Sequence, residues 1–564
     1  MDRRFKTVAA FGTSCGYLCR YCFRILPFGL RPAVILITCT ILWFSMFILP
    51  PPAFAGDKSR NRADRAVRDG DFELAERLYR EMLSKDPHNT EARLGLGFTL
   101  YKMRNLHDAF DHAARVISEE PLSSGGHSLL GLVILTSGDF RRSIEEFRTA
   151  LSLKSDDARA IAGLAMVDFY ENRMDRSVQG LRRAAYIDPR EPDYVFDLGQ
   201  VASRTEHFRE AADAYERFLV IAPKTDTDRR NRIRGLIDFL RYLGDQGTLY
   251  STSGQSRTSL AFERSGTRPI IQVRLNGSQE ILRFVLDTGS GMSVVSEKTA
   301  RRLGLKPVAR GGLARGVGGL GRFEIVYSFL SSMDIGDVHV SNVPVYIRQI
   351  YVSDTEVDGY IGLSVISKYI ATIDYGTWKF TLARRRDSDE DAAVQTPDAI
   401  ESDAVTRPKP ARVDIPLRFT SSGFLSGEVR LDGVDRPLNF IIDTGADISV
   451  VSEALFKTGD IDGFARGQRI PIYGAAGIAD SVMTLLLPRV SLGAHAREGI
   501  QAAVLDLEPI NETAGFDQVG ILGANFLRHF RVTFDFQKSI MRLERIQGDA
   551  KKEEVVPRNA TLPE

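Results

Sequence analysis

The sequence predicts a solenoid of helical hairpins followed by two copies of a small all-β domain that pair as a pseudo-dimer. Three observations carry this prediction. Small and apolar side chains recur with a fixed period in the first half of the chain. From about Gly254 onward the pattern changes to short strands with alternating apolar and polar residues, separated by turns. Within that second region the triplet Asp-Thr-Gly occurs twice.

Length and composition set the limits of the interpretation. The chain has 564 residues, which is too long for a single domain. Hydrophobic residues make up 43% and charged residues 26%, so the chain can bury substantial cores and is not globally disordered. The 74 Lys and Arg residues balance the 73 Asp and Glu residues, which gives no reason to expect a nucleic-acid partner.

The cysteines and histidines argue against several kinds of site. All four cysteines stand at or before Cys39, and the eight histidines are scattered without metal-ligand spacing. The body of the protein therefore has no cysteines for a disulfide framework, a structural zinc site or a nucleophile. We expect neither a metal ion nor a cofactor.

Residues 1–55 are predicted to be a basic leader. Several arginines precede an uncharged apolar run over 33–49, and a small-residue cleavage site could follow at Ala55. The run is short for a full membrane span but long enough for an anchor. A cleaved signal peptide and a retained signal anchor both place the rest of the chain outside the cytoplasm. We expect an exported protein, periplasmic or anchored in the inner membrane by residues 33–49 and facing the periplasm.

Residues 57–245 are predicted to form helical hairpins. Four registered positions repeat every 34 residues, as between Pro87 and Pro121. Small residues let paired helices approach closely, and Pro cannot continue a helix. The helix-ending positions are Pro87, Pro121, Ser155, Pro189 and Pro223; the two small series are Ala75, Ala109, Ser143, Ser177, Ala211 and Ala63, Gly97, Gly131, Ala165, Gly199; the apolar series is Phe72, Leu106, Phe140, Met174 and Phe208.

This pattern resembles tetratricopeptide repeats. The resemblance implies a solenoid of about five repeats with a concave surface that docks a protein partner or an extended substrate. The alternative is a spacer that holds the C-terminal part away from the membrane.

The two β copies are predicted over 255–383 and 413–546. Residues 384–412 lack an apolar period and are rich in Asp, Glu, Ala, Pro and Thr, which is typical of a flexible linker. The polar tail 547–564 is predicted to be disordered. A linker of this length can span two small adjacent domains, which favours pairing of the two copies within one chain.

Each copy delivers one Asp from an apolar strand into a tight Thr-Gly turn. These aspartates are Asp287 and Asp443, and each triplet is followed at the same offset by Ser-Val-Val-Ser. Two carboxyl groups held close together cannot both ionise, so the pair shares one proton. One can then act as a base towards a water while the other acts as an acid towards a carbonyl.

Both copies close with an apolar-apolar-Gly step that leads to a final pair of strands. The step ends at Gly362 in the first copy and at Gly523 in the second. With the duplicated Asp-Thr-Gly, this order resembles the retropepsin-like (clan AA) aspartic proteases. The resemblance covers roughly 268–383 and 413–546.

The resemblance implies an aspartic-type endopeptidase whose catalytic dyad is Asp287 and Asp443. Thr288 and Thr444 match threonines that lock the pair. Ser290 is expected to be able to hydrogen-bond the neighbouring carboxylate, which Ala446 cannot do. The residues expected to support the dyad are Thr288, Gly289, Ser290, Thr444, Gly445 and Ala446.

In this family a glycine-tipped hairpin, the flap, closes over the substrate. The matching glycines are Gly316, Gly318 and Gly319 in the first copy and Gly474 and Gly477 in the second. The alternative for each is an ordinary glycine hairpin without a gating role. An aromatic side chain of the kind that pepsin-like flaps use is missing from both hairpins unless Tyr473 serves.

Two other functional hypotheses remain open at this point. Each copy could pair with its counterpart in a second chain, which would give a homodimer with two sites. The protein could also be a non-catalytic binder of peptides or envelope polymer on a protease fold. The intact Asp-Thr-Gly in both copies favours the peptidase, with a peptide or protein as the substrate.

Overall fold

The computed structural model describes residues 53–263, 266–351, 356–384 and 413–546. The apolar run predicted as a signal or anchor, the linker from residue 385 and the tail lie outside these residues. Helix α2 begins at Ala53, inside the stretch predicted as the leader. No helix in the described part is both long and apolar enough to cross a membrane. The chain from Arg62 onward forms one compact unit.

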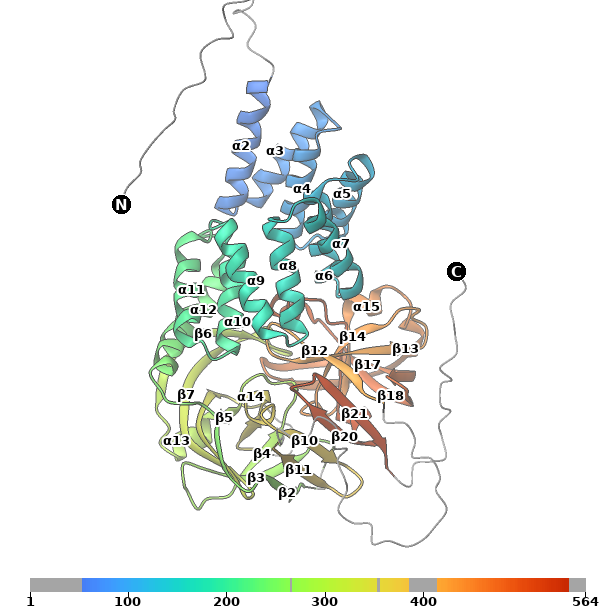
Figure 1. The fold of residues 1–564 in the computed structure, drawn as a ribbon. Coiled ribbons are helices and arrows are strands. Elements are labelled where there is room, and N and C mark those ends of the chain that lie inside the picture. Colours follow the sequence, from blue (N-terminus) through green and yellow to red (C-terminus); the bar gives the residue numbers. More distant parts are fainter. Residues whose placement is uncertain (1–52, 264–265, 352–355, 385–412, 547–564) are drawn as a thin grey trace, which may run out of the picture. The chain divides into compact units, whose positions relative to one another are not determined.

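The first half of the described chain is helical throughout (Figure 1). Its helices follow each other with short connections. They are α2 (Ala53–Asp69), α3 (Phe72–Lys85), α4 (Thr90–Lys102), α5 (Leu106–Glu119), α6 (Ser124–Thr136), α7 (Phe140–Leu153), α8 (Ala158–Tyr170), α9 (Met174–Ile187), α10 (Pro192–Arg204), α11 (Phe208–Ile221) and α12 (Thr227–Gly244).

The predicted period appears in the helices themselves. The apolar series marks the first residue of the second helix in each of five hairpins, from Phe72 in α3 to Phe208 in α11. The preceding polar residue caps several of these helices: Asp71 accepts from the Leu74 N–H and Asp139 from the Arg142 N–H. The small residues on the second helices are fully buried, as Ala109 shows. The prediction of a tetratricopeptide-like solenoid is confirmed.

The first β lobe follows α12. Its elements are β1 (Ser251–Gly254), β2 (Arg257–Ala261), β3 (Ile270–Leu275), β4 (Leu282–Leu286), β5 (Val294–Ser296), α13 (Glu297–Arg302), β6 (Pro307–Arg315), β7 (Arg322–Ile335), β8 (Val338–Arg348), β9 (Gly359–Ile361), α14 (Leu363–Ile366), β10 (Ile370–Asp374) and β11 (Lys379–Ala383). Strand β1 pairs with β8, so the lobe includes residues before the predicted boundary at 255. Arg384, predicted as the first linker residue, still donates its N–H to Ser256 O (2.7 Å).

The second lobe repeats the order of the first. Its elements are β12 (Ile415–Phe419), β13 (Leu425–Leu431), β14 (Leu438–Ile442), β15 (Ser449–Ser452), α15 (Glu453–Lys457), the 3-10 turn η1 (Asp462–Phe464), β16 (Ala465–Gly474), β17 (Gly477–Leu492), β18 (His495–Leu505), α16 (Glu508–Ala514), β19 (Gly520–Leu522), α17 (Ala524–Leu527), β20 (Phe530–Asp535) and β21 (Ile540–Arg545). In both lobes the Asp-bearing strand pairs in parallel with the strand of the apolar-Gly step: β4 with β9 and β14 with β19.

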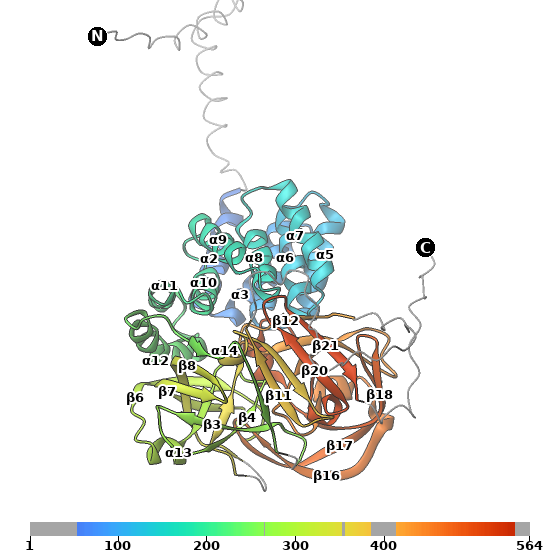
Figure 2. The same cartoon turned by 60° about the horizontal axis from the view of Figure 1, so that its bottom comes forward.

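One sheet joins the two lobes. Its strand order is β2-β11-β10-β20-β21-β12, so strands from both copies lie side by side at the junction (Figure 2). At the centre β10 and β20 run antiparallel, with Thr372 opposite Thr533. The two hydroxyl groups lie 3.1 Å apart in the buried interior. The structure therefore pairs the two copies within a single chain rather than leaving each for a partner chain.

The helical array packs directly on both lobes. Helix α12 lies along β6, so closely that a Cβ on Gly235 would stand 2.2 Å from the Arg310 carbonyl oxygen (Figures 1 and 2). On the second lobe, Phe516 meets Phe140 and Tyr170 of the array edge to face, with ring centroids 4.9 and 5.1 Å apart. Aromatic pairs of this geometry add to the free energy gained by burial alone.

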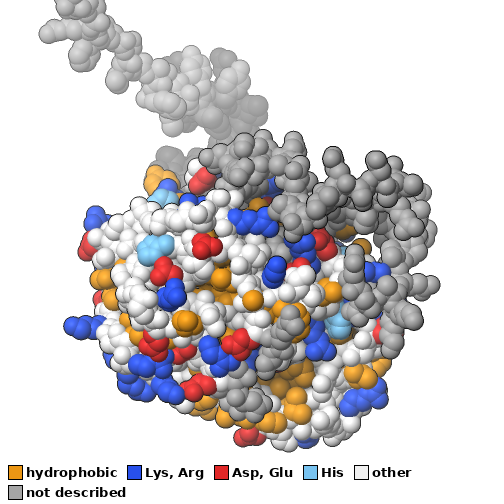
Figure 3. All heavy atoms as spheres, turned by 90° about the horizontal axis from the view of Figure 1, so that it is seen from below, with side chains coloured by type: hydrophobic (Ala, Val, Ile, Leu, Met, Phe, Trp, Pro, Cys, Tyr) orange, Lys and Arg blue, Asp and Glu red, His pale blue; other side chains and the backbone are white. Residues whose placement is uncertain are grey.

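The lobes present a mixed surface on the face shown in Figure 3. Lys and Arg side chains alternate there with Asp and Glu side chains, and neither sign forms a continuous patch. This distribution agrees with the nearly balanced charge of the whole chain.

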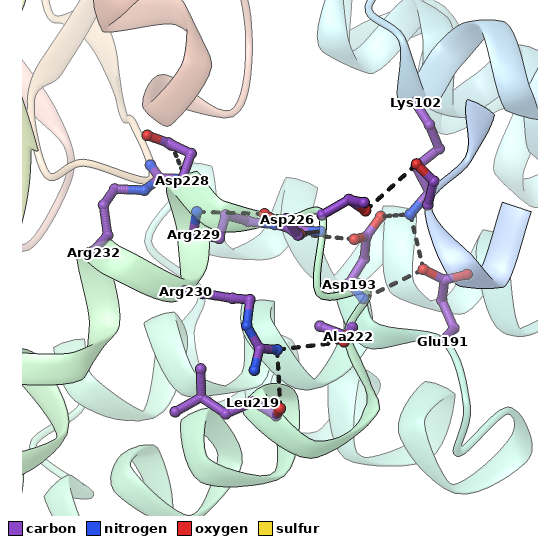
Figure 4. A network of polar contacts seen from close by, with 12 residues as sticks. Lys102, Glu191, Asp193, Leu219, Ala222, Asp226, Asp228, Arg229, Arg230 and Arg232 are labelled. Atoms are coloured by element: carbon purple, nitrogen blue, oxygen red, sulfur yellow. Dashed lines mark hydrogen bonds and ion pairs between the residues drawn. The ribbon is translucent and has the colours of Figure 1, made fainter. Parts of the chain in front are cut away.

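An ion-pair network fills part of the inner side of the array (Figure 4). Lys102 at the end of α4 reaches Glu191 (2.9 Å) and Asp193 at the start of α10. Arg229 of α12 pairs with the same Asp193 (2.8 Å) and with Asp226 (2.5 Å). Because the network ties an early repeat to the last ones, side chains occupy part of the inner surface that the sequence predicts as a docking groove.

Candidate active site

Both predicted aspartates lie just beyond the end of a buried strand. Asp287 follows β4, and its N–H donates to Ile361 O (3.0 Å). Asp443 follows β14, and its N–H donates to Leu522 O (3.0 Å). The apolar-Gly step of each copy therefore fixes the backbone at the Asp of that copy, which explains why the two motifs occur together.

Two threonines lock the Asp-bearing turns to each other across the lobes. The Thr288 N–H donates to Thr444 Oγ1 (3.1 Å), and the Thr444 N–H donates to Thr288 Oγ1 (3.0 Å). Each hydroxyl also donates to a main-chain oxygen of the opposite lobe, Thr288 to Ile442 and Thr444 to Leu286, both at 2.7 Å. Both threonines are fully buried, so these four bonds are shielded from water.

The glycine of each triplet makes room for the opposite carboxyl group. A Cβ on Gly289 would lie 2.4 Å from the Asp443 carboxyl carbon, and a Cβ on Gly445 would lie 2.8 Å from that of Asp287. Any side chain at either glycine would push the two carboxyl groups apart. The turns therefore bring Asp287 and Asp443 face to face at the junction of the lobes.

The two carboxyl groups have different surroundings. Burial, followed by the charge of Asp443, raises the pKa of Asp287 well above its usual range. Burial also raises the pKa of Asp443, but the N–H groups of Gly445 (2.7 Å) and Ala446 (3.2 Å) bond to its Oδ1 and favour its ionised form. Asp287 Oδ1 accepts from Gly289 N–H (2.9 Å). Asp287 is thus the better holder of a shared proton and Asp443 the better base.

Ser290 does not play the part expected of it. Its Oγ donates to the Met292 carbonyl oxygen (2.7 Å), which stabilises the turn rather than a carboxylate. The hydrogen bond to the neighbouring carboxylate that the sequence allows for Ser290 is therefore not the one its hydroxyl donates in this structure. At the matching position Ala446 does contact the carboxylate, but through its backbone N–H.

Arg348 is a site residue that the sequence analysis missed. It ends β8, its charge lowers the pKa of Asp287 against the effect of burial, and its Nη1 donates to Ala475 O (3.0 Å). Comparison of the two copies could have found it. In the first lobe β5 pairs with β8, and Arg348 lies opposite Ser296. In the second lobe the equivalent strands β15 and β18 pair in the same way, and Leu505 lies opposite Ser452. The Arg is therefore a difference between two otherwise matched lobes.

The two predicted flaps are hairpin turns that meet each other. Residues 316–321 connect β6 to β7, and Ala475 with Ala476 connects β16 to β17. The Ala476 N–H donates to Val317 O (2.9 Å), and the Gly319 N–H donates to Ile478 O (3.2 Å). Gly318 has φ +89° and would hold a Cβ 2.2 Å from Gly477 O, so only glycine fits this contact.

A cavity of about 1090 Å³ includes both carboxyl groups. Residues of the two flaps line it, among them Gly316 and Gly474, and so does Tyr473 of the second flap. Helices of the array line it as well, from α8 to α12, which the sequence analysis did not anticipate. Outside the cavity, His107, Asp108 and Asp111 of α5 lie close enough to share a cation, but His107 and Asp111 are exposed to solvent.

Family models match both parts of the chain. The aspartyl protease model matches residues 271–365 and 427–526, which hold one Asp-Thr-Gly each. A tetratricopeptide repeat model matches residues 66–132.

Similar proteins share only part of the chain. The BBSome complex member BBS4 of Bos taurus is 21% identical over 155 residues, which is 28% of this chain and 30% of that protein. Anaphase-promoting complex subunit 3 of Schizosaccharomyces pombe is 24% identical over 160 residues, 28% of this chain and 24% of that protein. The matched segments therefore span less than a third of these relatives.

Solved structures of tetratricopeptide repeat proteins match less than a third of this chain, at low overall similarity. A thermophilic TPR protein of Thermus thermophilus is 19% identical, covers 31% of this chain and 95% of its own, and has a TM-score of 0.27. MamA of Desulfovibrio magneticus is 20% identical, and the match covers 29% of this chain and 94% of that protein with a TM-score of 0.22. The family models thus place two matches to the aspartyl protease family after a match to tetratricopeptide repeats, in the order in which the β lobes follow the helical array.

Proposed function

We propose that this protein is an aspartic endopeptidase that cleaves peptide bonds with a water activated by Asp287 and Asp443. The observation that carries the proposal is the meeting of the buried Asp287 and the half-buried Asp443, from matched turns of two lobes, inside one large cavity. The surroundings that favour a proton on Asp287 and a charge on Asp443 support an acid and a base in one site.

The chemistry needs only these two groups and a water. Asp443 takes a proton from the water as its oxygen bonds to the peptide carbonyl carbon, and Asp287 gives its proton to the carbonyl oxygen. In the second half, Asp443 gives its proton to the amide nitrogen while Asp287 takes one from a hydroxyl of the tetrahedral diol. The carbon–nitrogen bond breaks, a carboxylic acid and an amine leave, and both carboxyl groups return to their starting states.

The flaps support binding of an extended peptide. They join above the site through backbone hydrogen bonds, so they must part for a peptide to enter and can then bond to its backbone. The array takes part in docking the substrate or a protein partner, since its last helices line the same cavity. The basic leader and the apolar run 33–49 support export to the periplasm, with or without a membrane anchor.

The test is cleavage of a mixed peptide library by the full-length protein from acidic to mildly alkaline pH, with and without pepstatin. The proposal requires cleavage by the wild type that falls by several orders of magnitude in Asp443→Asn and in Asp287→Asn. Asp460→Asn, which changes an exposed carboxyl of the second lobe outside the cavity, is the matched control and retains full cleavage.

Two results would contradict the proposal. Cleavage that survives in both Asn variants would mean that other groups do the chemistry. Peptide binding without cleavage at any pH would favour the non-catalytic binding protein instead.

A further inference from the structure

The cavity extends beyond the two lobes into the helical array. Side chains of α8, α10, α11 and α12 form one of its walls. They are mostly apolar, and Phe169, Phe196, Tyr215 and Phe239 are among them. A substrate segment that leaves the two carboxyl groups in this direction therefore contacts the array before it reaches solvent.

Six cationic side chains line the described cavity, and five of them have polar partners. Lys368 pairs with Glu206, Arg268 with Asp447, Arg232 with Asp228, Arg315 with Asp228 and Glu512, and Arg348 donates to Ala475 O. The sixth is Arg204, the last residue of α10. Among the described residues it has neither an acidic partner nor an acceptor for its buried Nη1.

The surroundings of Arg204 are aromatic. Its guanidinium carbon lies 3.8 Å from the ring centroid of Phe419 in the second lobe and 5.5 Å from that of Phe169 in α8. Burial without a compensating charge lowers the pKa of Arg204 to about 9. An Arg stacked on a ring directs its N–H groups into the plane of the guanidinium, the geometry that binds a carboxylate through two bonds. Because Nη1 is shielded from solvent, Nε and Nη2 are the nitrogens that would form these bonds.

We propose that Arg204 binds a carboxylate of the peptide in the cleft, so that the helical array supplies a specificity site of the protease. The inference rests on the proposed function insofar as it takes the ligand to be a peptide. The carboxylate belongs to an acidic side chain or to the C-terminus of the substrate. Arg204 is half-buried, and its shielded Nη1 has no acceptor among the described residues. A partly desolvated cation without a counter-ion is unfavourable in the free protein, and an incoming carboxylate offsets part of this cost.

The test compares short peptides that differ by one charge. One series exchanges Glu for Gln at successive positions, and a second carries a free or an amidated C-terminus. Cleavage efficiency is measured with the wild-type full chain, and binding is measured by fluorescence anisotropy with Asp443→Asn. We expect the charged member of one pair to be preferred roughly 10-fold to 100-fold, the range for a hydrogen-bonded charge. Dependence on one Glu identifies an acidic side chain, and dependence on the free terminus identifies the C-terminus.

Arg204 also contacts two rings, so a loss of packing must be separated from a loss of charge recognition. Arg204→Met keeps much of the apolar stem and should abolish the preference between charged and neutral peptides, whereas Arg204→Lys should restore part of it. Arg182→Met is the matched control, because Arg182 pairs with Glu210 on the exposed side of α9 and does not line the cavity.

The outcomes distinguish the inference from the proposed function. A charge preference in binding without any cleavage would support Arg204 and overturn the peptidase. Cleavage without any charge preference, or with a preference that Arg204→Met leaves unchanged, would overturn the role of Arg204 and leave the peptidase standing. Equal, weak binding of every peptide would overturn the inference as well.

Discussion

At the scale of single residues, the threonine lock sets the geometry of the site. Thr444 accepts from the Thr288 N–H and donates to Leu286 O, both in the fully buried interior. Thr444→Ala leaves both groups of the opposite lobe without a partner. Since each of the two unsatisfied buried groups costs about 1–3 kcal/mol, we expect the free energy of unfolding to fall by roughly 2–6 kcal/mol. Chemical denaturation of the variant measures this loss.

Thr444→Ser is the matched control for the lock. It keeps the hydroxyl and removes one methyl group, so its loss of stability should be about 1 kcal/mol. Equal stability of the Ala variant and the wild type would show that the lock contributes nothing to folding.

The buried carboxyl of Asp287 makes stability depend on pH. Its pKa is raised in the folded state from an ordinary value of 3.8, mainly by burial and then by the charge of Asp443. The protonated Asp287 therefore contributes to the free energy of unfolding when the pH is below the ordinary pKa of 3.8. This contribution is lost as the pH rises through the raised pKa of the folded state. Asp287→Asn cannot ionise, so its melting temperature should exceed that of the wild type at mildly alkaline pH and approach it at acidic pH.

Melting curves across the pH range, with Asp447→Asn as the control, test this expectation. Asp447 pairs with Arg268 and is about half exposed. If Asp287→Asn raised the melting temperature by the same amount at every pH, the carboxyl group of Asp287 would not be held neutral by its surroundings.

At the scale of elements, the two flaps differ in support. Strand β6 of the first flap lies along α12, and Arg315 at its end pairs with Asp228 (2.6 Å) and Glu512 (2.5 Å). Strand β16 of the second flap is exposed at every position from Ala465 to Arg469. The first flap is thus supported by the array, and the second is the freer one to move.

Hydrogen exchange can measure this difference. We expect amides of β16 to exchange faster than those of β6, because exchange follows local opening. Arg315→Met should speed exchange over 307–323, whereas Arg466→Met in the exposed part of β16 should change little. Equal exchange in both flaps of the wild type would mean that α12 does not restrain the first one.

The elements that the sequence predicts well are those set by local pattern. The starts of the second helices follow the apolar series, and the flap turns follow the glycines, because side-chain period and backbone freedom act over a few residues. Ser290, Arg348 and Arg204 could not be assigned in this way. Their contacts depend on how the folded chain places each side chain, as when Arg204 meets Phe419 of the second lobe.

At the scale of the whole chain from Arg62 onward, array and lobes share buried contacts. Phe516 of the second lobe is 1% exposed and packs against Phe140 and Tyr170 of the array. Next to it, the Asp517 N–H donates to Thr136 O at the end of α6 (2.8 Å). Such contacts predict that the array and the protease lobes unfold together rather than as independent domains.

Phe516→Ala tests this coupling. Removal of a buried Phe side chain costs about 3–5 kcal/mol, and here the loss falls on the junction of array and lobes. We therefore expect the wild type to show one calorimetric transition and the variant to show two, since the weakened junction no longer transmits stability between the parts. Phe516→Leu fills most of the space and should keep one transition at a lower temperature. Two calorimetric transitions in the wild type would contradict this expectation. They would mean that the junction is too weak to make the array a fixed wall of the cleft. The charge preference assigned to Arg204 would then require the bound peptide itself to hold the array in place.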